Sequence, residues 1–274
     1  MTVADVLTAC ERVNHEGIAV TLDSLGESVR DEPEARASAD VYHQLLDDIA
    51  QRGLHANVSV KLSQMGMEFD PTLAERIMAE LVGHAAEVHS FVRIDMESST
   101  YTEATIAMTE RLASRFPGSV GAVLQAYLYR TVEDAERLLN QGIRIRLCKG
   151  AYKEGPAVAF ASKAEVDASY IRLMKRLVTF SKDGQGVFCG IATHDEGIIE
   201  KLLAFVRENN VPKSAFEFQM LYGIRRDLQR QLSAEGFGVR VYVPLGPEWF
   251  PYFMRRLAER PANLLFLAKN VLRS

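Results

Sequence analysis

The feature that most constrains this chain is a regular alternation of two hydrophobic periods along most of its length. Short apolar runs typical of buried strands are expected at 18–22, 57–62, 91–96, 120–126, 143–148, 187–192, 215–220 and 239–243. Helical patterns follow them at 33–52, 71–89, 101–115, 131–140, 160–182, 195–208 and 223–234, and another covers 2–16. Because no linker rich in proline, glycine or serine interrupts these eight units, they predict one α/β domain over residues 1–274, a TIM-type (β/α)8 barrel.

A doubly wound open sheet is the alternative for such an alternation. The first strand-to-helix turn lacks a GxGxxG fingerprint, and no GxxxxGK[ST] phosphate loop occurs in the chain. These absences disfavour a Rossmann or phosphate-loop function and leave the barrel as the preferred fold. We expect a leading helix at 1–17, the barrel at 18–244 and a C-terminal helical segment at 247–271.

In a parallel barrel the functional side chains lie at the C-terminal ends of the strands. Nearly every predicted strand end is polar or ionisable here, with Asp23, Leu25, Gly26, Glu27, Lys61, Ser63, Gln64, Asp95, Glu97, Gln125, Tyr127, Arg146, Lys149, Gly150, Ala151, Tyr152, Thr193, His194, Asp195, Gln219, Leu221, Tyr222 and Tyr242. Taken singly, each side chain can serve as a helix cap or a solvated loop residue, and Asp195 is placed to cap the helix after it. Taken together, they predict a large polar pocket.

The segment 247–271 has the pattern of an amphipathic helix. At about 100° per residue, Tyr252, Arg255 and Arg256 share one face, opposite Phe253 and Leu257. Planar guanidinium groups on adjacent residues suit an anion held through parallel hydrogen bonds, although ordinary surface arginines would give the same pattern. The pair therefore indicates a site for a small carboxylate or phosphate.

The remaining cations of the predicted pocket imply a second anionic ligand, because Lys61, Arg146 and Lys149 exceed what one small carboxylate needs. The small-residue turn after Lys149 offers backbone amides for close approach of a cofactor, and the Thr193-His194 pair offers hydrogen bonds to ribityl or phosphate oxygens. No HExxH or CxxC motif is present, so His194 is expected to form hydrogen bonds and no metal is predicted.

Composition narrows the class of protein further. A formal net charge of -4 with dispersed basic residues argues against a nucleic-acid partner. The N-terminus has no signal-peptide pattern, no run approaches a membrane span, and the three cysteines lie far apart as in a reduced protein. A cytoplasmic protein is expected, at most peripheral to the inner face of the membrane.

Five motifs, taken in order, resemble those of the FAD-dependent proline dehydrogenase family. They are Ser59-Val60-Lys61-Leu62-Ser63, Arg146-Leu147-Cys148-Lys149-Gly150-Ala151-Tyr152, Ala192-Thr193-His194, Phe218-Gln219-Met220-Leu221-Tyr222-Gly223 and Tyr252-Phe253-Met254-Arg255-Arg256-Leu257-Ala258-Glu259. The resemblance extends from about Ala19 to the C-terminus, and it is to the monofunctional form because no aldehyde dehydrogenase domain follows. It implies a distorted (β/α)8 barrel with non-covalent FAD at the strand ends and the last helix over the barrel mouth.

The resemblance also implies roles for single residues. Lys61, Arg255 and Arg256 match the residues that hold the proline carboxylate, and the ring is enclosed by the matches of Tyr152, Leu221, Tyr242 and Tyr252. Asp95 matches an acidic residue of the active site, and Glu27 matches a glutamate that pairs with the first arginine and gates the site. Arg146 matches an arginine beside the flavin N5, and further flavin contacts match Gln125, Lys149, Gly150, Ala151, Thr193, His194 and the backbone near Ile94.

The implied reaction is oxidation of L-proline to 1-pyrroline-5-carboxylate by hydride transfer to FAD. The implied partners are L-proline, a quinone electron acceptor reached by transient peripheral membrane contact, and a separate pyrroline-5-carboxylate dehydrogenase downstream. Three positions depart from the family pattern, namely Lys153, Tyr222 and Asp195. The residues alone leave two alternatives open, a Schiff-base or phosphate-handling barrel lyase that uses Lys61 or Lys149, and a non-catalytic binding barrel.

Overall fold

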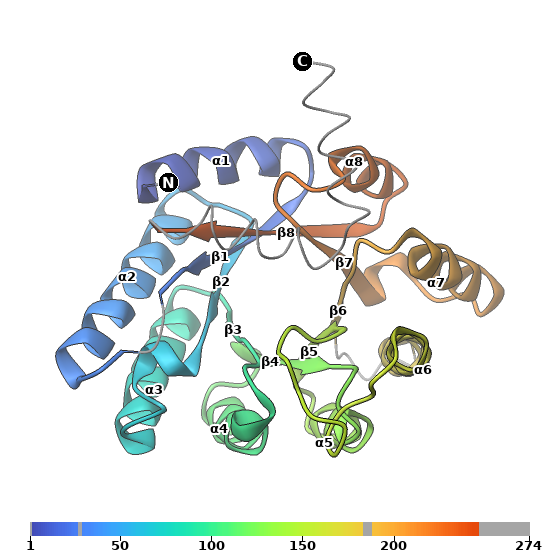
Figure 1. The fold of residues 1–274 in the computed structure, drawn as a ribbon. Coiled ribbons are helices and arrows are strands. Elements are labelled where there is room, and N and C mark those ends of the chain that lie inside the picture. The colour runs from blue at the N-terminus through green and yellow to red at the C-terminus, as the bar shows by residue number, and fades with distance from the viewer. Residues whose placement is uncertain (1, 27–28, 183–187, 247–274) are drawn as a thin grey trace, which may run out of the picture.

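Eight parallel strands close into a barrel in the computed structural model, which describes residues 2–26, 29–182 and 188–246. In chain order the strands are β1 Ala19–Ser24, β2 Ala56–Val60, β3 Val92–Ile94, β4 Val120–Gln125, β5 Arg144–Cys148, β6 Cys189–Ala192, β7 Phe216–Leu221 and β8 Gly238–Leu245. Each strand pairs with its neighbours in sequence, and β8 returns to pair with β1 (Figure 1). The predicted (β/α)8 barrel is confirmed; the helix expected over its mouth lies outside the described residues.

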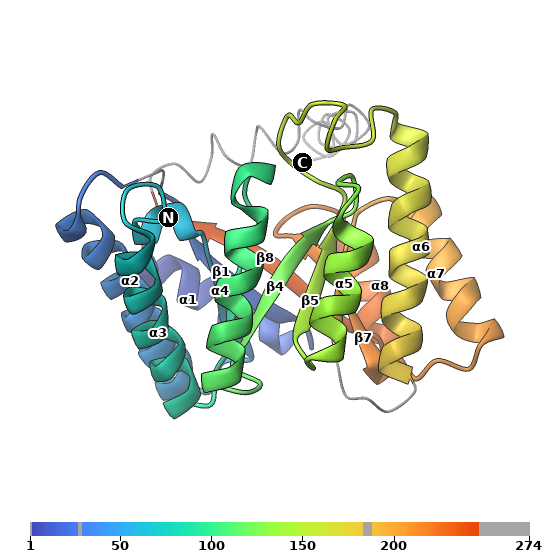
Figure 2. The same ribbon diagram turned by 90° about the horizontal axis from the view of Figure 1, so that it is seen from below.

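Helices surround the barrel. They are α1 Val3–His15, α2 Glu32–Gln51, α3 Pro71–Glu87, α4 Thr102–Arg115, α5 Thr131–Asn140, α6 Lys163–Lys182, α7 Glu196–Glu208 and α8 Arg226–Ala234, with 3₁₀ turns at Leu62–Met65, Ser99–Tyr101 and Lys213–Ala215. Figure 2 shows α3, α4, α5 and α6 following one another along the outside. The extra helix α1 packs against β1, β8 and α2 and so fills the ring between α8 and α2 (Figure 1).

The starts of the helices follow from their capping residues. Asp31 accepts the backbone N–H of Glu34 at 3.0 Å ahead of α2, and Asp70 accepts the N–H of Leu73 at 3.0 Å ahead of α3. Both helices carry proline in the first turn, where its missing N–H costs nothing. The helix predicted from residue 223 begins instead at Arg226, because Gly223 and Arg225 have positive φ angles of 78° and 53°.

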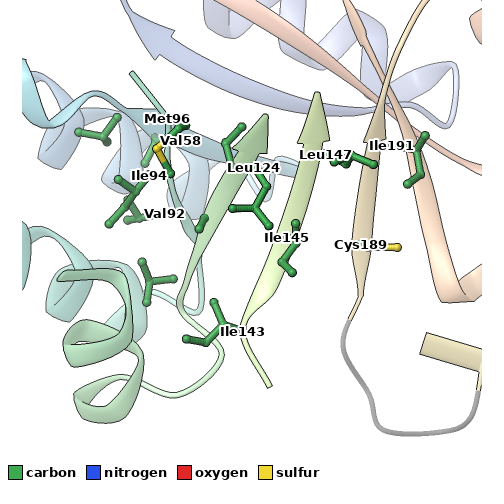
Figure 3. Packing of buried hydrophobic residues seen from close by; sticks show 14 of the residues in the cluster. Val58, Val92, Ile94, Met96, Leu124, Ile143, Ile145, Leu147, Cys189 and Ile191 are labelled. Atoms are coloured by element: carbon green, nitrogen blue, oxygen red, sulfur yellow. The ribbon is translucent and has the colours of Figure 1, made fainter. Parts of the chain in front are cut away.

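The strands alternate between an apolar outer face and a mainly polar inner face. On the outside, residues such as Ile94, Leu124, Ile145, Leu147 and Ile191 are buried against the helices (Figure 3). On the inside, the alternate positions are mainly polar, with Thr21, Asp23, Asn57, Ser59, Arg93, Asp95, Gln125, Arg146, Glu217, Gln219, Arg240 and Tyr242. Barrel interiors are usually filled by branched apolar side chains. This barrel differs, because an internal column of hydrogen-bonded polar groups lies beneath its mouth.

The lower half of this column joins strands that are distant in sequence. Arg240 donates to the Glu217 carboxylate at 2.7 Å and to Asn57 Oδ1 at 2.8 Å, and Thr21 donates to the same Asn57 oxygen at 2.8 Å. Gln219 donates to Glu217 at 2.6 Å, which links this layer to the groups above it. Because buried polar groups are strongly unfavourable without partners, these contacts fix the side chains that support the mouth.

Candidate active site

A cavity opens at the C-terminal ends of the strands. Among the residues singled out from the sequence, it is lined by Lys61, Asp95, Gln125, Arg146, Lys149, Gly150, Ala151, Tyr152, Thr193, His194, Leu221 and Tyr242. Ile94 is fully buried on the outer face of β3, so only its backbone is near the barrel interior. Glu27, Tyr252, Arg255 and Arg256 lie outside the described residues.

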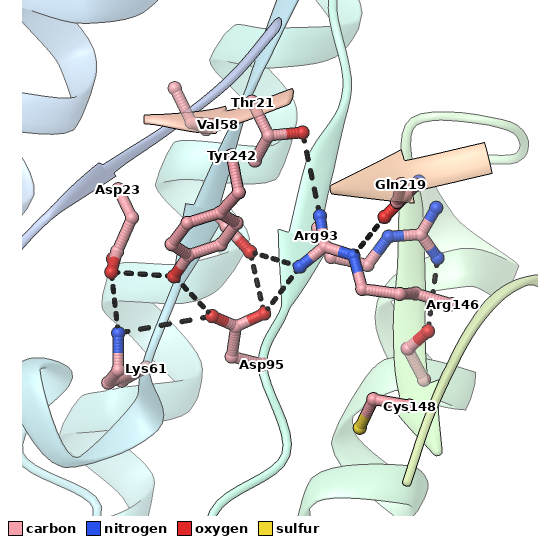
Figure 4. A network of polar contacts seen from close by, with 12 residues as sticks. Thr21, Asp23, Val58, Lys61, Arg93, Asp95, Arg146, Cys148, Gln219 and Tyr242 are labelled. Atoms are coloured by element: carbon pink, nitrogen blue, oxygen red, sulfur yellow. Dashed lines mark hydrogen bonds and ion pairs between the residues drawn. The ribbon is translucent and has the colours of Figure 1, made fainter. Parts of the chain in front are cut away.

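Asp95 stands at the centre of the polar side of the cavity. One carboxylate oxygen accepts from Ser59 at 2.7 Å and from the Arg146 guanidinium at 2.9 Å. The other accepts from the Tyr242 hydroxyl at 2.9 Å, and the Lys61 ammonium lies 3.9 Å from it (Figure 4). The four donors come from the ends of β2, β5 and β8, so the closed barrel itself assembles the cluster.

The pKa of the Asp95 carboxyl reflects two opposing effects. Burial raises it, but the charges of Arg146 and Lys61 and the hydrogen bonds from Ser59 and Tyr242 outweigh burial and hold the pKa below its ordinary value of 3.8. The carboxylate therefore stays ionised at neutral pH, although only 13% of its side chain is exposed.

This depressed pKa predicts a stability contribution that disappears in acid. A lowered pKa in the folded state stabilises the fold above the unfolded value, and the contribution is lost as pH falls through the folded pKa, below 3.8. We expect Asp95→Asn to lower the free energy of unfolding by about 3 kcal/mol at neutral pH, the cost of breaking a buried pair. Urea unfolding from about pH 7 to about pH 3 should show the gap between wild type and variant closing in the most acidic samples. A gap that does not change with pH would contradict this account.

Arg146 is held in place from two sides. Its Nε donates to Gln219 Oε1 at 2.5 Å, its Nη1 binds Asp95, and its guanidinium carbon lies 5.4 Å from the centre of the Tyr242 ring. Gln219 reaches this position because Gly190, the register partner of Arg146 on β6, has no side chain; a Cβ atom there would lie 2.3 Å from the Gln219 amide nitrogen. A missing side chain on β6 thus makes room for the residue that orients the arginine.

Gln125, at the end of β4, fixes two of the loops that surround the cavity. Its amide nitrogen donates to the backbone oxygen of Glu97 at 2.9 Å, and its amide oxygen accepts from the backbone N–H of Ala151 at 3.2 Å. The side chain, expected to touch a cofactor, therefore joins the loop after β3 to the loop after β5. Gly150 beside it has φ 131°, and the Tyr127 ring packs against it so closely that a Cβ atom would lie 2.5 Å from that ring.

Lys149 makes two ion pairs across the rim. Its ammonium bonds the Asp167 carboxylate of α6 and lies 2.9 Å from the Asp195 carboxylate after β6. The prediction that Asp195 caps α7 is wrong, because no side-chain cap hydrogen bond forms there and the carboxylate turns to Lys149 instead. A partly buried long-range ion pair forms here in place of a local cap.

His194 has a defined tautomer in this site. Its Nε2 accepts the backbone N–H of Leu221 at 2.9 Å, so in the neutral ring the proton resides on Nδ1. The bond ties the end of β6 to the end of β7. Thr193 beside it accepts the backbone N–H of Asp195 at 3.1 Å, which shapes the same loop.

Three residues with clear roles here were not selected as site residues from the sequence. The sequence predicts Gln219, Asp23 and Glu97 only as polar strand-end residues. Gln219 orients Arg146, Asp23 binds two cavity residues, and Glu97 accepts both the backbone N–H and the hydroxyl of Ser63, at 3.0 and 2.6 Å. The sequence indicates only that these residues stand at strand ends, because the residues that they bind lie on other strands.

Over the described ranges, no group of three or more histidine, cysteine, aspartate or glutamate side chains is arranged to hold a metal ion. Within the same ranges, no helix is both long and apolar enough to cross a membrane.

A closed parallel barrel with ionised side chains converging at its C-terminal mouth defines a (β/α)8-barrel enzyme. The sequence model of the proline dehydrogenase family matches residues 6–269. "Proline dehydrogenase 1" of Bacillus subtilis subsp. natto is 38% identical over 272 residues, 99% of this chain and 88% of that protein. "Proline dehydrogenase" of Deinococcus radiodurans is 40% identical over 280 residues, 99% of this chain and 87% of that protein.

The chain belongs to the proline dehydrogenase family and is an enzyme of proline catabolism. Its fold matches a solved structure, proline utilization A from Bdellovibrio bacteriovorus inactivated by N-propargylglycine. The TM-score is 0.83 at 24% identity, over 92% of this chain and 31% of that one, so this likeness speaks for the fold alone.

Proposed function

We propose that this chain oxidises L-proline to 1-pyrroline-5-carboxylate at the barrel mouth, where bound FAD would accept the hydride from C5 of the ring. The observation that carries the proposal is the convergence of Lys61, Asp95, Arg146 and Tyr242 on one cavity. Family membership supplies the reaction class. The geometry adds an ionised and closely hydrogen-bonded cluster where a small zwitterion can be oriented.

The lining of the cavity fits a flavin nucleotide in its donor chemistry. Arg146 supplies a fixed cation, His194 an imidazole proton on Nδ1, and the turn from Lys149 to Ala151 supplies small residues beside the mouth. Thr193 and Gln125 line the same side of the cavity. These residues would hold the cofactor, with Arg146 favouring electron density on the ring system beside it.

Substrate binding is assigned to a second set of side chains around the cavity. Lys61 would hold the proline carboxylate together with Arg255 and Arg256, which lie outside the described residues. Tyr152, Leu221 and Tyr242 line the cavity and would enclose the ring with Tyr252, and Glu27 would gate the entrance. Binding the carboxylate on fixed cations would orient C5, the carbon that loses the hydride.

Asp95 would act on the charge that develops during oxidation. Loss of a hydride from C5 leaves positive charge shared between that carbon and the ring nitrogen. The Asp95 carboxylate is ionised, lines the cavity and is held by Ser59, Arg146 and Tyr242, so it meets this charge without having to reorganise.

The lyase alternative is disfavoured by the ion pairs of both lysines. A lysine that forms a Schiff base attacks a carbonyl through its neutral amine. Here the Lys61 ammonium lies 2.7 Å from Asp23, and the Lys149 ammonium binds two carboxylates. A charged and ion-paired ammonium has no lone pair to offer.

We extend the proposal to the partners that this reaction needs. A quinone would take up the electrons during transient peripheral contact of a cytoplasmic enzyme with the inner face of the membrane. A separate pyrroline-5-carboxylate dehydrogenase would consume the product. These partners follow from the reaction of the family and are independent of the geometry described above.

The test is an anaerobic titration of the purified protein. We expect a yellow protein whose flavin absorption bleaches on adding L-proline and stays unchanged with D-proline, with the cyclic imine captured by an aromatic aminoaldehyde. Proline-independent reductive trapping by borohydride of a carbonyl substrate on Lys61 or Lys149 would favour the lyase instead. A colourless protein that binds no flavin would overturn the proposal.

A further inference from the structure

Asp23, at the end of β1, is a buried acid directly behind the cavity. It has no exposed surface and does not line the cavity, yet it binds two residues that do. One carboxylate oxygen accepts from the Lys61 ammonium at 2.7 Å and from the Tyr242 hydroxyl at 2.6 Å (Figure 4). The other accepts from the Tyr42 hydroxyl of α2 at 3.2 Å.

A carboxylate in such a position is strongly unfavourable unless donors surround it. Its donors come from three elements, α2, β8 and the residue after β2, so Asp23 fixes these elements relative to one another. Burial and the charge of Asp23 raise the pKa of Tyr42 well above its ordinary value, which keeps that hydroxyl a donor. The Tyr42 hydroxyl shares its one hydrogen with Ser24 O and Gln64 Oε1, at 3.2 and 3.1 Å, and so links Asp23 to the barrel wall through a small network.

Asp23 decides where the Lys61 ammonium lies. The ammonium is 2.7 Å from Asp23 but 3.9 Å from Asp95, which already accepts from Ser59, Arg146 and Tyr242. Without a charge at Asp23, the nearest carboxylate within the described part of the chain would be that of Asp95. The ammonium would then move toward the centre of the cluster and compete with Arg146.

Asp23 also orients the phenol of Tyr242. That hydroxyl has one hydrogen and lies 2.6 Å from an oxygen of Asp23 and 2.9 Å from an oxygen of Asp95. A single hydrogen serves one carboxylate fully, so the two acids together determine the rotation of the hydroxyl and the tilt of the ring.

We propose that Asp23 is a positioning residue for proline oxidation, which holds the Lys61 ammonium and the Tyr242 phenol in the geometry that receives the substrate. It acts through these two side chains and does not touch proline itself. The inference rests on the proposed function, since it takes Lys61 and Tyr242 as groups that contact the substrate.

The first experiment compares Asp23→Asn with wild type as FAD-loaded full-length enzymes. We expect the flavin content to be unchanged and KM for L-proline to rise about tenfold or more, as for the loss of a charge-assisted contact, with kcat changing much less. The control is Asp134→Asn, which removes another buried carboxylate, paired with Arg130 on α5 away from the cavity. The control should leave KM unchanged.

The second experiment is a double-mutant cycle with Lys61→Met. If Asp23 acts through Lys61, the double variant should have nearly the KM of Lys61→Met alone, because the two effects are not additive. Lys61→Met leaves the Asp23 charge without its cation, so adding Asp23→Asn should raise Tm above that of Lys61→Met. This comparison holds even where Asp23→Asn alone does not fold.

The outcomes separate the inference from the function on which it rests. Lys61→Met with an unchanged KM would overturn the proposed substrate clamp. Lys61→Met with a raised KM, together with a folded Asp23→Asn of normal KM or with fully additive effects in the double variant, would overturn the positioning role of Asp23 alone.

Discussion

Arg146→Met is expected to lower kcat for L-proline at least about 100-fold, the loss typical of removing one preorganised electrostatic contact. The guanidinium is buried, fixed by Gln219 and Asp95, and lies across the face of Tyr242, so a methionine replaces its bulk but neither its charge nor its planar hydrogen bonds. Stopped-flow reduction of the flavin by proline would measure the effect directly.

Arg146→Lys is the matched control for this prediction. It restores the charge beside Asp95 without the two-sided hydrogen bonding, and we expect a partial recovery of kcat. Flavin content, circular dichroism and Tm of each variant would separate a catalytic loss from a folding loss, since the methionine leaves Asp95 without its nearest cation. A variant that loses only affinity for proline, with kcat intact, would place Arg146 in the carboxylate clamp instead.

The sequence sufficed for the architecture because each strand–helix unit is specified locally. The apolar outer faces of the strands and the capping acids Asp31 and Asp70 are visible within short windows, and the ends of the elements differ from the prediction by a few residues at most. The same short stretches of sequence also show polar residues at the strand ends. Barrel geometry then brings those strand ends together.

What the sequence could not supply was the pairing of those residues across the barrel. Asp23 meets Tyr242 only because β8 closes against β1, and Gln219 meets Arg146 only because Gly190 leaves space between them. The interpretation of Asp195 as a cap failed for the same reason. Its preferred local role was overridden by Lys149, 46 residues away in the chain.

One signal for the internal polar column was present in the sequence. Buried parallel strands usually read as continuous apolar runs, whereas here charged or polar residues recur at alternate positions of β5 and β7, and from β3 into the residue that follows it. A charge at such a position is acceptable only where another strand supplies its partner. Alternation of this kind in a parallel barrel therefore predicts a functional site at the mouth, held in place by the polar side chains below it. The prediction does not depend on any single sequence motif.

Tyr242→Ser is expected to lower kcat/KM for L-proline about 100-fold or more, because it removes both the ring and the donor shared by Asp23 and Asp95. It should also raise the relative rate with trans-4-hydroxy-L-proline, since the ring fills space that a hydroxyl on C4 would need. The measurement is kcat/KM for both substrates on flavin-loaded enzyme.

Tyr242→Phe separates the two contributions of the residue. The ring remains, so preference for proline over the hydroxylated substrate should persist. The shared donor is lost, so two carboxylates on either side of the phenol position would repel without a hydrogen between them, and kcat/KM should fall for both substrates. If serine and phenylalanine gave the same substrate ratio as tyrosine, Tyr242 would be a packing residue of the barrel rim, and substrate choice would have to lie with other residues around the cavity.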